Sequence, residues 1–141
     1  MIRKLKQVLI SGVIVGFVIE SVDIVFNWLI QFIWPYNVLE LGGMRTLDDP
    51  IMFLFFVYPW VLGFALAYVF SYFEKTLEGD YIVKGLKFGF LMWVVISIPA
   101  AFLMFSSMNY PIGFTINSVV PPILYMILSG IAIAKAYDWL K

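Results

Sequence analysis

The stretch VLISGVIVGFVIESVDIVFNWLIQFIW, residues 8–34, decides the fold class of this chain. Its only charged residues are two acids, Glu20 and Asp23, which stand one helical turn apart. At about 1.5 Å per residue, a helix of this length reaches roughly 40 Å, which exceeds the roughly 30 Å of a bilayer's hydrocarbon. The stretch therefore predicts a transmembrane helix with two carboxyl groups near its middle.

The rest of the 141-residue chain has the same character, with 63% hydrophobic and only 13% charged residues. Soluble domains average about 25% charged residues. Three more apolar segments are long enough to cross a bilayer, at about residues 51–73, 85–106 and 112–135. We therefore expect an all-α integral membrane protein, in which residues 1–141 form a single domain of four transmembrane helices.

Lys and Arg residues lie almost entirely on one side of this arrangement. Eight of the nine stand before the first segment, between the second segment and the first residues of the third, or at the end of the fourth, and only Arg45 stands elsewhere. The positive-inside rule then predicts that both termini are cytoplasmic, in an inner or plasma membrane. The first apolar run is too long for a signal peptide and no cleavage motif follows it, so we expect it to be retained.

Small residues recur at matching positions in the two halves of the chain. Gly12 and Gly16 in the first segment match Gly85 and Gly89 in the third, and GFALA at 63–67 matches GIAIA at 130–134. The four glycines are predicted helix-packing positions, with the face around Gly85 and Gly89 as one candidate contact between protomers. Two tandem helical hairpins, related as a parallel pseudo-repeat, would explain the match. The alternative is that small residues recur wherever membrane helices pack.

The first segment carries a polar stripe along one helical face, because its members are spaced by three or four residues. The stripe consists of Gly12, Gly16, Glu20, Asp23, Asn27 and Gln31. Two carboxyl groups about 5–6 Å apart in a low dielectric do not readily both ionise, and no Lys or Arg lies at matching depth. We therefore predict a proton- or cation-binding site at Glu20, Asp23 and Asn27, with Gln31 as an auxiliary residue. The alternative is that Glu20 and Asp23 are protonated and only hydrogen-bond to neighbouring helices, which stabilises the bundle. The stripe does not specify a metal.

Prolines interrupt the later segments, and we predict helix kinks at Pro99, Pro121 and Pro122. Asn117 and Tyr125 keep near one face of the fourth segment. We expect that face to meet the stripe and supply auxiliary ligands. In the second segment, Pro59 with its aromatic neighbours is interpreted as packing at the membrane interface.

The residues that the chain lacks exclude several functions. Without Cys or His it has no thiol nucleophile, imidazole base or zinc–thiolate site. It contains no catalytic or phosphate-binding motif, so we expect no enzyme and no cofactor. A nucleic-acid partner would need a basic surface, which the sequence does not provide.

Four helices with a membrane glutamate in the first resemble, in outline, the small multidrug-resistance exporters, which alternate protons and cationic substrates at such a residue. This chain is longer and differs in its outer loop, in Asp23 and in its charge asymmetry. The leading hypothesis is a proton- or cation-coupled transporter or channel protomer, expected to be a homo-oligomer because four helices enclose little room. The alternative is an accessory or assembly subunit whose acidic stripe pairs with a helix of a larger membrane complex.

Overall fold

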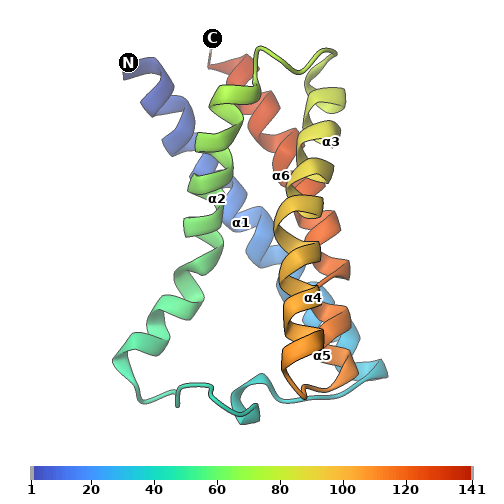
Figure 1. Ribbon diagram of the computed structural model, residues 1–141. Coiled ribbons are helices and arrows are strands. Elements are labelled where there is room, and N and C mark those ends of the chain that lie inside the picture. Colours follow the sequence, from blue (N-terminus) through green and yellow to red (C-terminus); the bar gives the residue numbers. More distant parts are fainter. Residues whose placement is uncertain (1, 141) are drawn as a thin grey trace.

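The computed structural model describes residues 2–140, and within that range all regular secondary structure is helical. Four helical segments are long and apolar enough to cross a membrane, Ile2–Ile33, Pro50–Phe73, Tyr81–Ser107 and Ile112–Trp139. This confirms the predicted all-α architecture with four membrane-length helices. The segments alternate in direction, so both ends of the chain lie at the same end of the bundle (Figure 1). We call this the terminal end and the opposite one the loop end.

The first two segments form one hairpin. Helix α1 (Ile2–Ile33) is longer than its apolar run because its basic N-terminal residues continue the helix. A connection follows that contains two single-turn 3₁₀ helices, η1 (Val38–Glu40) and η2 (Pro50–Met52). Helix α2 (Phe53–Phe73) then returns to the terminal end.

The last two segments form a second hairpin, and both are irregular. The third consists of α3 (Tyr81–Met92), a π-helical turn η3 (Trp93–Ser97) and α4 (Ile98–Ser107). The fourth is broken into α5 (Ile112–Asn117) and α6 (Val120–Trp139). Asp80 caps α3, since its carboxylate accepts a hydrogen bond of 2.9 Å from the Val83 amide.

The predicted kinks fall next to these irregularities. Pro121 and Pro122 occupy the first turn of α6, directly after the break, where their missing N–H groups cost no helical bond. Pro99 stands at the start of α4, just after the π-helical turn. The indole Nε1 of Trp93 donates a hydrogen bond of 3.1 Å to the Val119 carbonyl, which joins η3 to the break.

Each hairpin is held by close backbone contact at glycine. A Cβ on Gly63 would strike the backbone of Gly12 and Gly16, and a Cβ on Gly130 would strike that of Gly85 and Gly89. The glycines thus allow α1 to meet α2, and α3 to meet α6, more closely than larger residues would. The suggestion that Gly85 and Gly89 form a face between protomers is wrong, because α6 of the same chain occupies that face.

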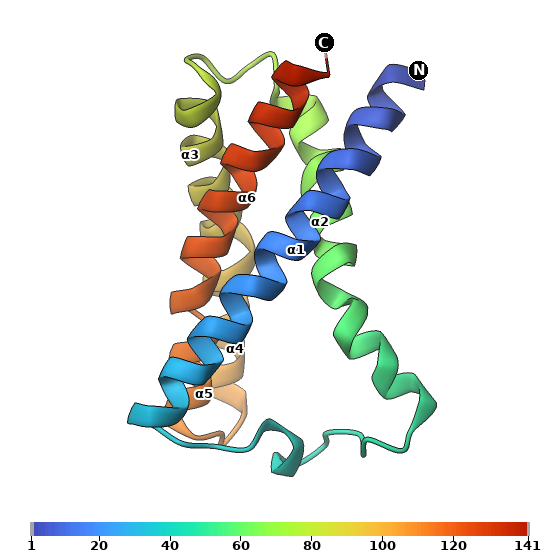
Figure 2. The same ribbon diagram turned by 180° about the vertical axis from the view of Figure 1, so that it is seen from behind.

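The two hairpins meet through α1 and α6, which pack against each other at the centre of the bundle (Figure 2). The core lies towards the terminal end, where the Phe70 ring makes edge-to-face contacts with Phe88 and Tyr137 at 5.1 and 5.2 Å. The buried Tyr137 hydroxyl donates a 2.9 Å hydrogen bond to the Ala67 carbonyl. The terminal end is therefore filled by packed side chains.

The loop end is organised differently, because α2 diverges there from the other helices (Figures 1 and 2). The long connection after α1 crosses this end. Its start is fixed by Gln31, whose side chain donates to the Tyr36 carbonyl at 2.6 Å and accepts from the Tyr36 amide at 3.1 Å. The Tyr110 hydroxyl, from the turn after α4, donates to the Gly42 carbonyl at 3.0 Å. The connection is therefore tied to both hairpins.

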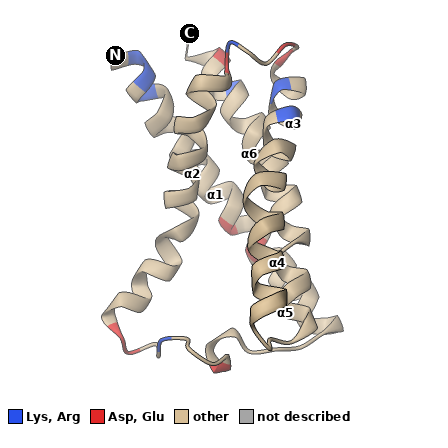
Figure 3. Ribbon diagram, in the orientation of Figure 1, with Lys and Arg blue, Asp and Glu red and all other residues tan. Residues whose placement is uncertain are grey.

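Charged side chains are separated in space as well as in sequence. Among the described residues, every Lys and Arg except Arg45 lies towards the terminal end (Figure 3). The acids of α1 lie away from both ends of the bundle, in its otherwise uncharged part. The asymmetry on which the predicted orientation rests is thus present in the three-dimensional arrangement.

Candidate functional site

A cavity of about 500 Å³ lies towards the loop end, between the diverging half of α2 and the second hairpin. Helix α1 forms its back wall, and α4, α5 and α6 contribute the wall opposite α2. Tyr36 and Val38, from the connection after α1, line the side of the cavity that faces the loop end. The cavity is therefore a product of the divergence of α2 from the bundle.

The polar stripe of α1 supplies the acidic part of the lining, through Glu20, Asp23 and Asn27. Both acids are half-buried. Neither carboxyl group makes a hydrogen bond or ion pair with any residue from 2 to 140, and no Lys or Arg is among the lining residues. Asp23 is about ten residues, or roughly 15 Å of helix, from the end of α1 at Ile33. The two acids thus lie inside the membrane-length segment without a protein countercharge.

Hydroxyl and amide groups face these acids from the other helices. Tyr125 of α6 is only 6% exposed, yet it lines the cavity and its hydroxyl makes no hydrogen bond within the described chain. Asn117 at the end of α5 also lines the cavity, and its buried Oδ1 atom has no hydrogen-bond partner there. Two acceptor-bearing side chains are therefore held at the cavity without a protein donor.

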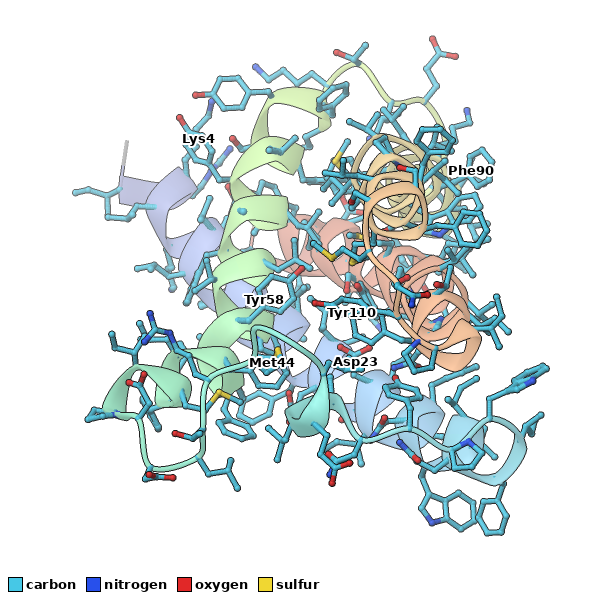
Figure 4. The ribbon with its side chains drawn as sticks, turned by 60° about the horizontal axis from the view of Figure 1, so that its bottom comes forward. Lys4, Asp23, Met44, Tyr58, Phe90 and Tyr110 are labelled. Carbon is cyan, nitrogen blue, oxygen red and sulfur yellow. The ribbon has the colours of Figure 1, made fainter. Side chains whose placement is uncertain are left out.

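Three tyrosines share the lining of the cavity with Asp23, namely Tyr36 from the loop, Tyr58 from α2 and Tyr125 from α6. Figure 4, with the loop end brought forward, shows Asp23 and Tyr58 among the side chains between these helices. Burial raises the pKa of the Tyr36 hydroxyl above its ordinary value, and the adjacent Asn117 amide opposes that shift. Tyr36 therefore remains a neutral hydroxyl group beside the cavity at neutral pH.

Aromatic rings complete the lining. Phe55 and Phe56 stand on α2 with their rings edge to face at 5.5 Å, and Phe114 on α5 packs edge to face on Tyr36 at 5.8 Å. Ring faces attract cations, and carboxyl, amide and hydroxyl oxygens can ligate or solvate them. The described residues contain no cluster of three acidic, His or Cys side chains that could hold a metal ion. The lining thus combines two carboxyl groups, amide and hydroxyl groups and aromatic rings.

The structure brings together five of the six residues predicted to bind or assist, namely Glu20, Asp23, Asn27, Asn117 and Tyr125. Gln31 is the exception. Its amide is engaged by both backbone groups of Tyr36 and it does not line the cavity, so its role as an auxiliary ligand is corrected to a structural one.

Several lining residues had no functional assignment from sequence. Tyr58 was interpreted as an interfacial aromatic and Pro59 as interfacial packing, yet both line the cavity. Ser97 is buried at the end of the π-helical turn and also lines it. An aromatic residue beside a proline inside a helix, as in Tyr58-Pro59 of α2, is the signal that could have found this wall.

Comparisons with protein-family models, with curated proteins and with solved structures find no match to this chain. Function therefore has to be inferred from the geometry and chemistry of the cavity.

Proposed function

We propose that this protein binds a cation or proton within the membrane, as a small proton- or cation-coupled transporter or as one protomer of a channel. In this proposal it resides in an inner or plasma membrane with both termini in the cytoplasm, and its cavity lies in the outer half of the bilayer. The two hairpins are taken as a parallel pseudo-repeat, which the matched glycine contacts support. In this proposal the protein acts as a homo-oligomer, since four helices enclose little room.

The observation that carries the proposal is the state of the two carboxyl groups. Glu20 and Asp23 line a cavity in a membrane-length helix, and no residue from 2 to 140 gives either one a hydrogen bond or an ion pair. Charged groups at such depth cost about 2.5–3.5 kcal/mol each on insertion scales unless they are compensated. A bound proton or cation supplies that compensation.

The surrounding residues have distinct roles in this proposal. Glu20 accepts the proton or cation and Asp23 is its coupled partner, because charge on either acid alters the free energy of charging the other. Asn27 and Asn117 offer amide oxygens, and the hydroxyl groups of Tyr58 and Tyr125 complete the polar shell. Among the described residues, no basic side chain lines the cavity and competes with the cation for the acids.

Ion flux in proteoliposomes tests the proposal. The purified protein is reconstituted with an internal pH dye, and proton flux is followed under gradients of Na⁺, K⁺ and organic cations. We expect flux with the wild type and its loss with Glu20→Gln, because the amide keeps the shape of the acid and removes its charge. Asp23→Asn should reduce flux and alter its dependence on pH.

Matched control variants are Glu78→Gln and Asp48→Asn, which make the same chemical changes at exposed positions outside the spans. Both should leave flux unchanged. Flux that survives in the double variant Glu20→Gln/Asp23→Asn would contradict the proposal, as would the absence of flux from well-folded wild-type protein.

The second candidate is a non-transporting accessory or assembly subunit. It is favoured by the same unpaired carboxyl groups, which could form ion pairs with a Lys or Arg of a partner helix that packs against the cavity. A subunit of this kind would give no flux alone, and purification from native membranes would recover a specific partner. That association would be lost in Glu20→Gln and Asp23→Asn.

A further inference from the structure

The loop and the core close the cavity on two sides. Towards the loop end, Tyr36 and Val38 lie over it, and the hydrogen bonds of Gln31 and Tyr110 hold the loop in place. Towards the terminal end, the space between the hairpins is filled by fully buried side chains such as Ile19 and Met126. Neither end of the bundle therefore offers the easiest way in.

The remaining side lies between α2 and α4. Helix α2 packs on α1 and to a smaller extent on α6, without extensive packing on α4. Phe55 and Phe56 on one side of this gap, and Ile96 and Ala100 on the other, line the cavity and are also exposed. Because these helices have membrane length, this mouth faces the hydrocarbon of the bilayer.

The size of the cavity also indicates its occupant. Its volume of about 500 Å³ falls within the range of pockets for small organic ligands. It is more than ten times the roughly 30 Å³ that one water molecule occupies in the liquid. A proton or a bare metal ion would leave most of this space, and its aromatic wall, unused.

We infer that the cavity takes an amphiphilic organic cation, which enters sideways from the membrane between α2 and α4. Its charged group is held by Glu20 and Asp23, with the unpartnered Tyr125 hydroxyl and Asn117 amide oxygen beside it. Its apolar part lies against Phe55, Phe56 and Met104 at the mouth. This inference deepens the proposed function and rests on it, since it names the class of cation.

Equilibrium binding of tetraphenylphosphonium to the purified protein in lipid nanodiscs tests the chemistry. Tetraphenylborate is the control, because it has nearly the same shape with the opposite charge, and tetramethylammonium is a cation without the apolar bulk. We expect saturable binding of tetraphenylphosphonium at one site per cavity. Glu20→Gln should weaken that binding about tenfold or more, since it removes a partly desolvated opposite charge. Tetraphenylborate should not bind at this site, and tetramethylammonium should bind much more weakly.

A pair of variants tests the lateral entrance. Ala100→Trp places a large ring at the mouth, whereas Leu103→Trp places the same ring on α4 at a residue that is 63% exposed and outside the lining. We expect Ala100→Trp to slow tetraphenylphosphonium association about tenfold or more. The ring raises the activation free energy of entry, and about 1.4 kcal/mol of added barrier slows a rate tenfold. Leu103→Trp should leave the association rate unchanged.

The outcomes separate this inference from the proposed function. If the wild type shows Glu20-dependent proton or metal-ion flux but does not bind tetraphenylphosphonium, the inference is overturned and the proposed function stands. If neither flux nor binding occurs, both fail. Equal binding of tetraphenylborate would overturn selection by charge, and equal association rates for the two Trp variants would overturn the lateral entrance.

Discussion

The two hairpins of this protein make the same backbone contact at glycine but differ in how far they stay closed. In each, a glycine of the returning helix meets the backbone of two glycines spaced by four residues, Gly63 in the first hairpin and Gly130 in the second. Beyond that contact the second hairpin stays closed as far as the short turn after α4. The first opens, because α2 diverges from α1 towards a long connection.

This difference shows how one bundle supplies both a scaffold and a site. The closed hairpin gives a wall whose position is set by backbone contact, and it carries no acid within the cavity. The open hairpin carries Glu20 and Asp23 and leaves room in front of them. Opening one of two similar hairpins therefore creates a polar cavity without disturbing the glycine contacts that hold the bundle.

The largest expected effect on stability comes from substituting a glycine at the backbone contact of the closed hairpin. The matching substitution in the open hairpin is the comparison. A Cβ on Gly89 would strike the backbone of Met126 and Ile127, whereas the atoms nearest to a Cβ on Gly16 belong to the Trp60 ring. We expect Gly89→Ala to lower the free energy of unfolding by about 1–3 kcal/mol, the usual cost of overpacking. Gly16→Ala should cost less, because the whole Trp60 side chain can rotate to relieve the clash, whereas the backbone of α6 cannot move without disturbing its helix.

Thermal unfolding of both variants in the same detergent measures this difference, with the wild type as reference. Any gain in helix propensity on replacing glycine by alanine is common to both positions and cancels in the comparison. Equal losses for Gly89→Ala and Gly16→Ala would show that the two hairpins are equally rigid at their contacts.

A smaller effect is expected where the hairpins are joined. The buried Tyr137 hydroxyl donates to the Ala67 carbonyl, which links α6 of one hairpin to α2 of the other. Tyr137→Phe removes that hydrogen bond and should cost about 1 kcal/mol of stability. Tyr72→Phe is the control, since its hydroxyl pairs with that of Tyr68 at an exposed position. A loss for Tyr72→Phe as large as that for Tyr137→Phe would contradict this account.

The next effect is confined to the loop that covers the cavity. Gln31→Ala removes both hydrogen bonds to the Tyr36 backbone and should release the start of the connection. We expect amide hydrogen exchange at residues 34–40 to rise about fivefold, the equivalent of about 1 kcal/mol of local stability. Thr46→Ala, in the same connection, should leave exchange at these residues unchanged. In Gln31→Ala, amide hydrogen exchange throughout the second hairpin should also stay unchanged.

The smallest effect concerns pH at the end of the same connection. The Ile51 amide and the Arg45 guanidinium hold the pKa of the Asp49 carboxyl below its ordinary value. The stabilisation is therefore present above the unfolded pKa of about 3.9 and is lost as the pH falls through the lower pKa of the folded state. The protection factor of the Ile51 amide, which is the intrinsic exchange rate at each pH divided by the observed rate, should fall on acidification to about pH 3. Asp49→Asn should weaken that pH dependence, and an unchanged profile in this variant would refute the cap.

Much of this arrangement was predictable from the sequence because it depends on periodicity. Spacings of three and four residues place Glu20, Asp23 and Asn27 on one face of α1 whatever surrounds that helix. Likewise, Asn117 and Tyr125 could be assigned to the face that meets the acids, although the break between α5 and α6 lies between them. The glycine pairs correctly predicted close helix packing, but they did not indicate which helix each pair would pack against.

The rest depended on features that periodicity does not contain. The π-helical turn changes which residues of the third segment face inward, so the inward position of Ser97 could not be read from a 3.6-residue repeat. Tyr58 was expected at the membrane interface because it lies near one end of its segment. That position indicates its depth in the membrane, but it does not indicate which face of the helix the side chain is on. Gln31 continues the stripe in sequence, but the chain reverses nearby and its backbone at Tyr36 engages the amide.

The hydrogen bond between Trp93 and Val119 has a mechanical consequence. It couples the two irregular places of the second hairpin, and both stand at the level of the cavity, which Ile96 and Asn117 line. Helix α3 ends just before Trp93 and α6 begins just after Val119, so the two helices cannot separate at this level without breaking that bond. The hydrogen bond thus fastens the second hairpin at the place where both of its segments are irregular.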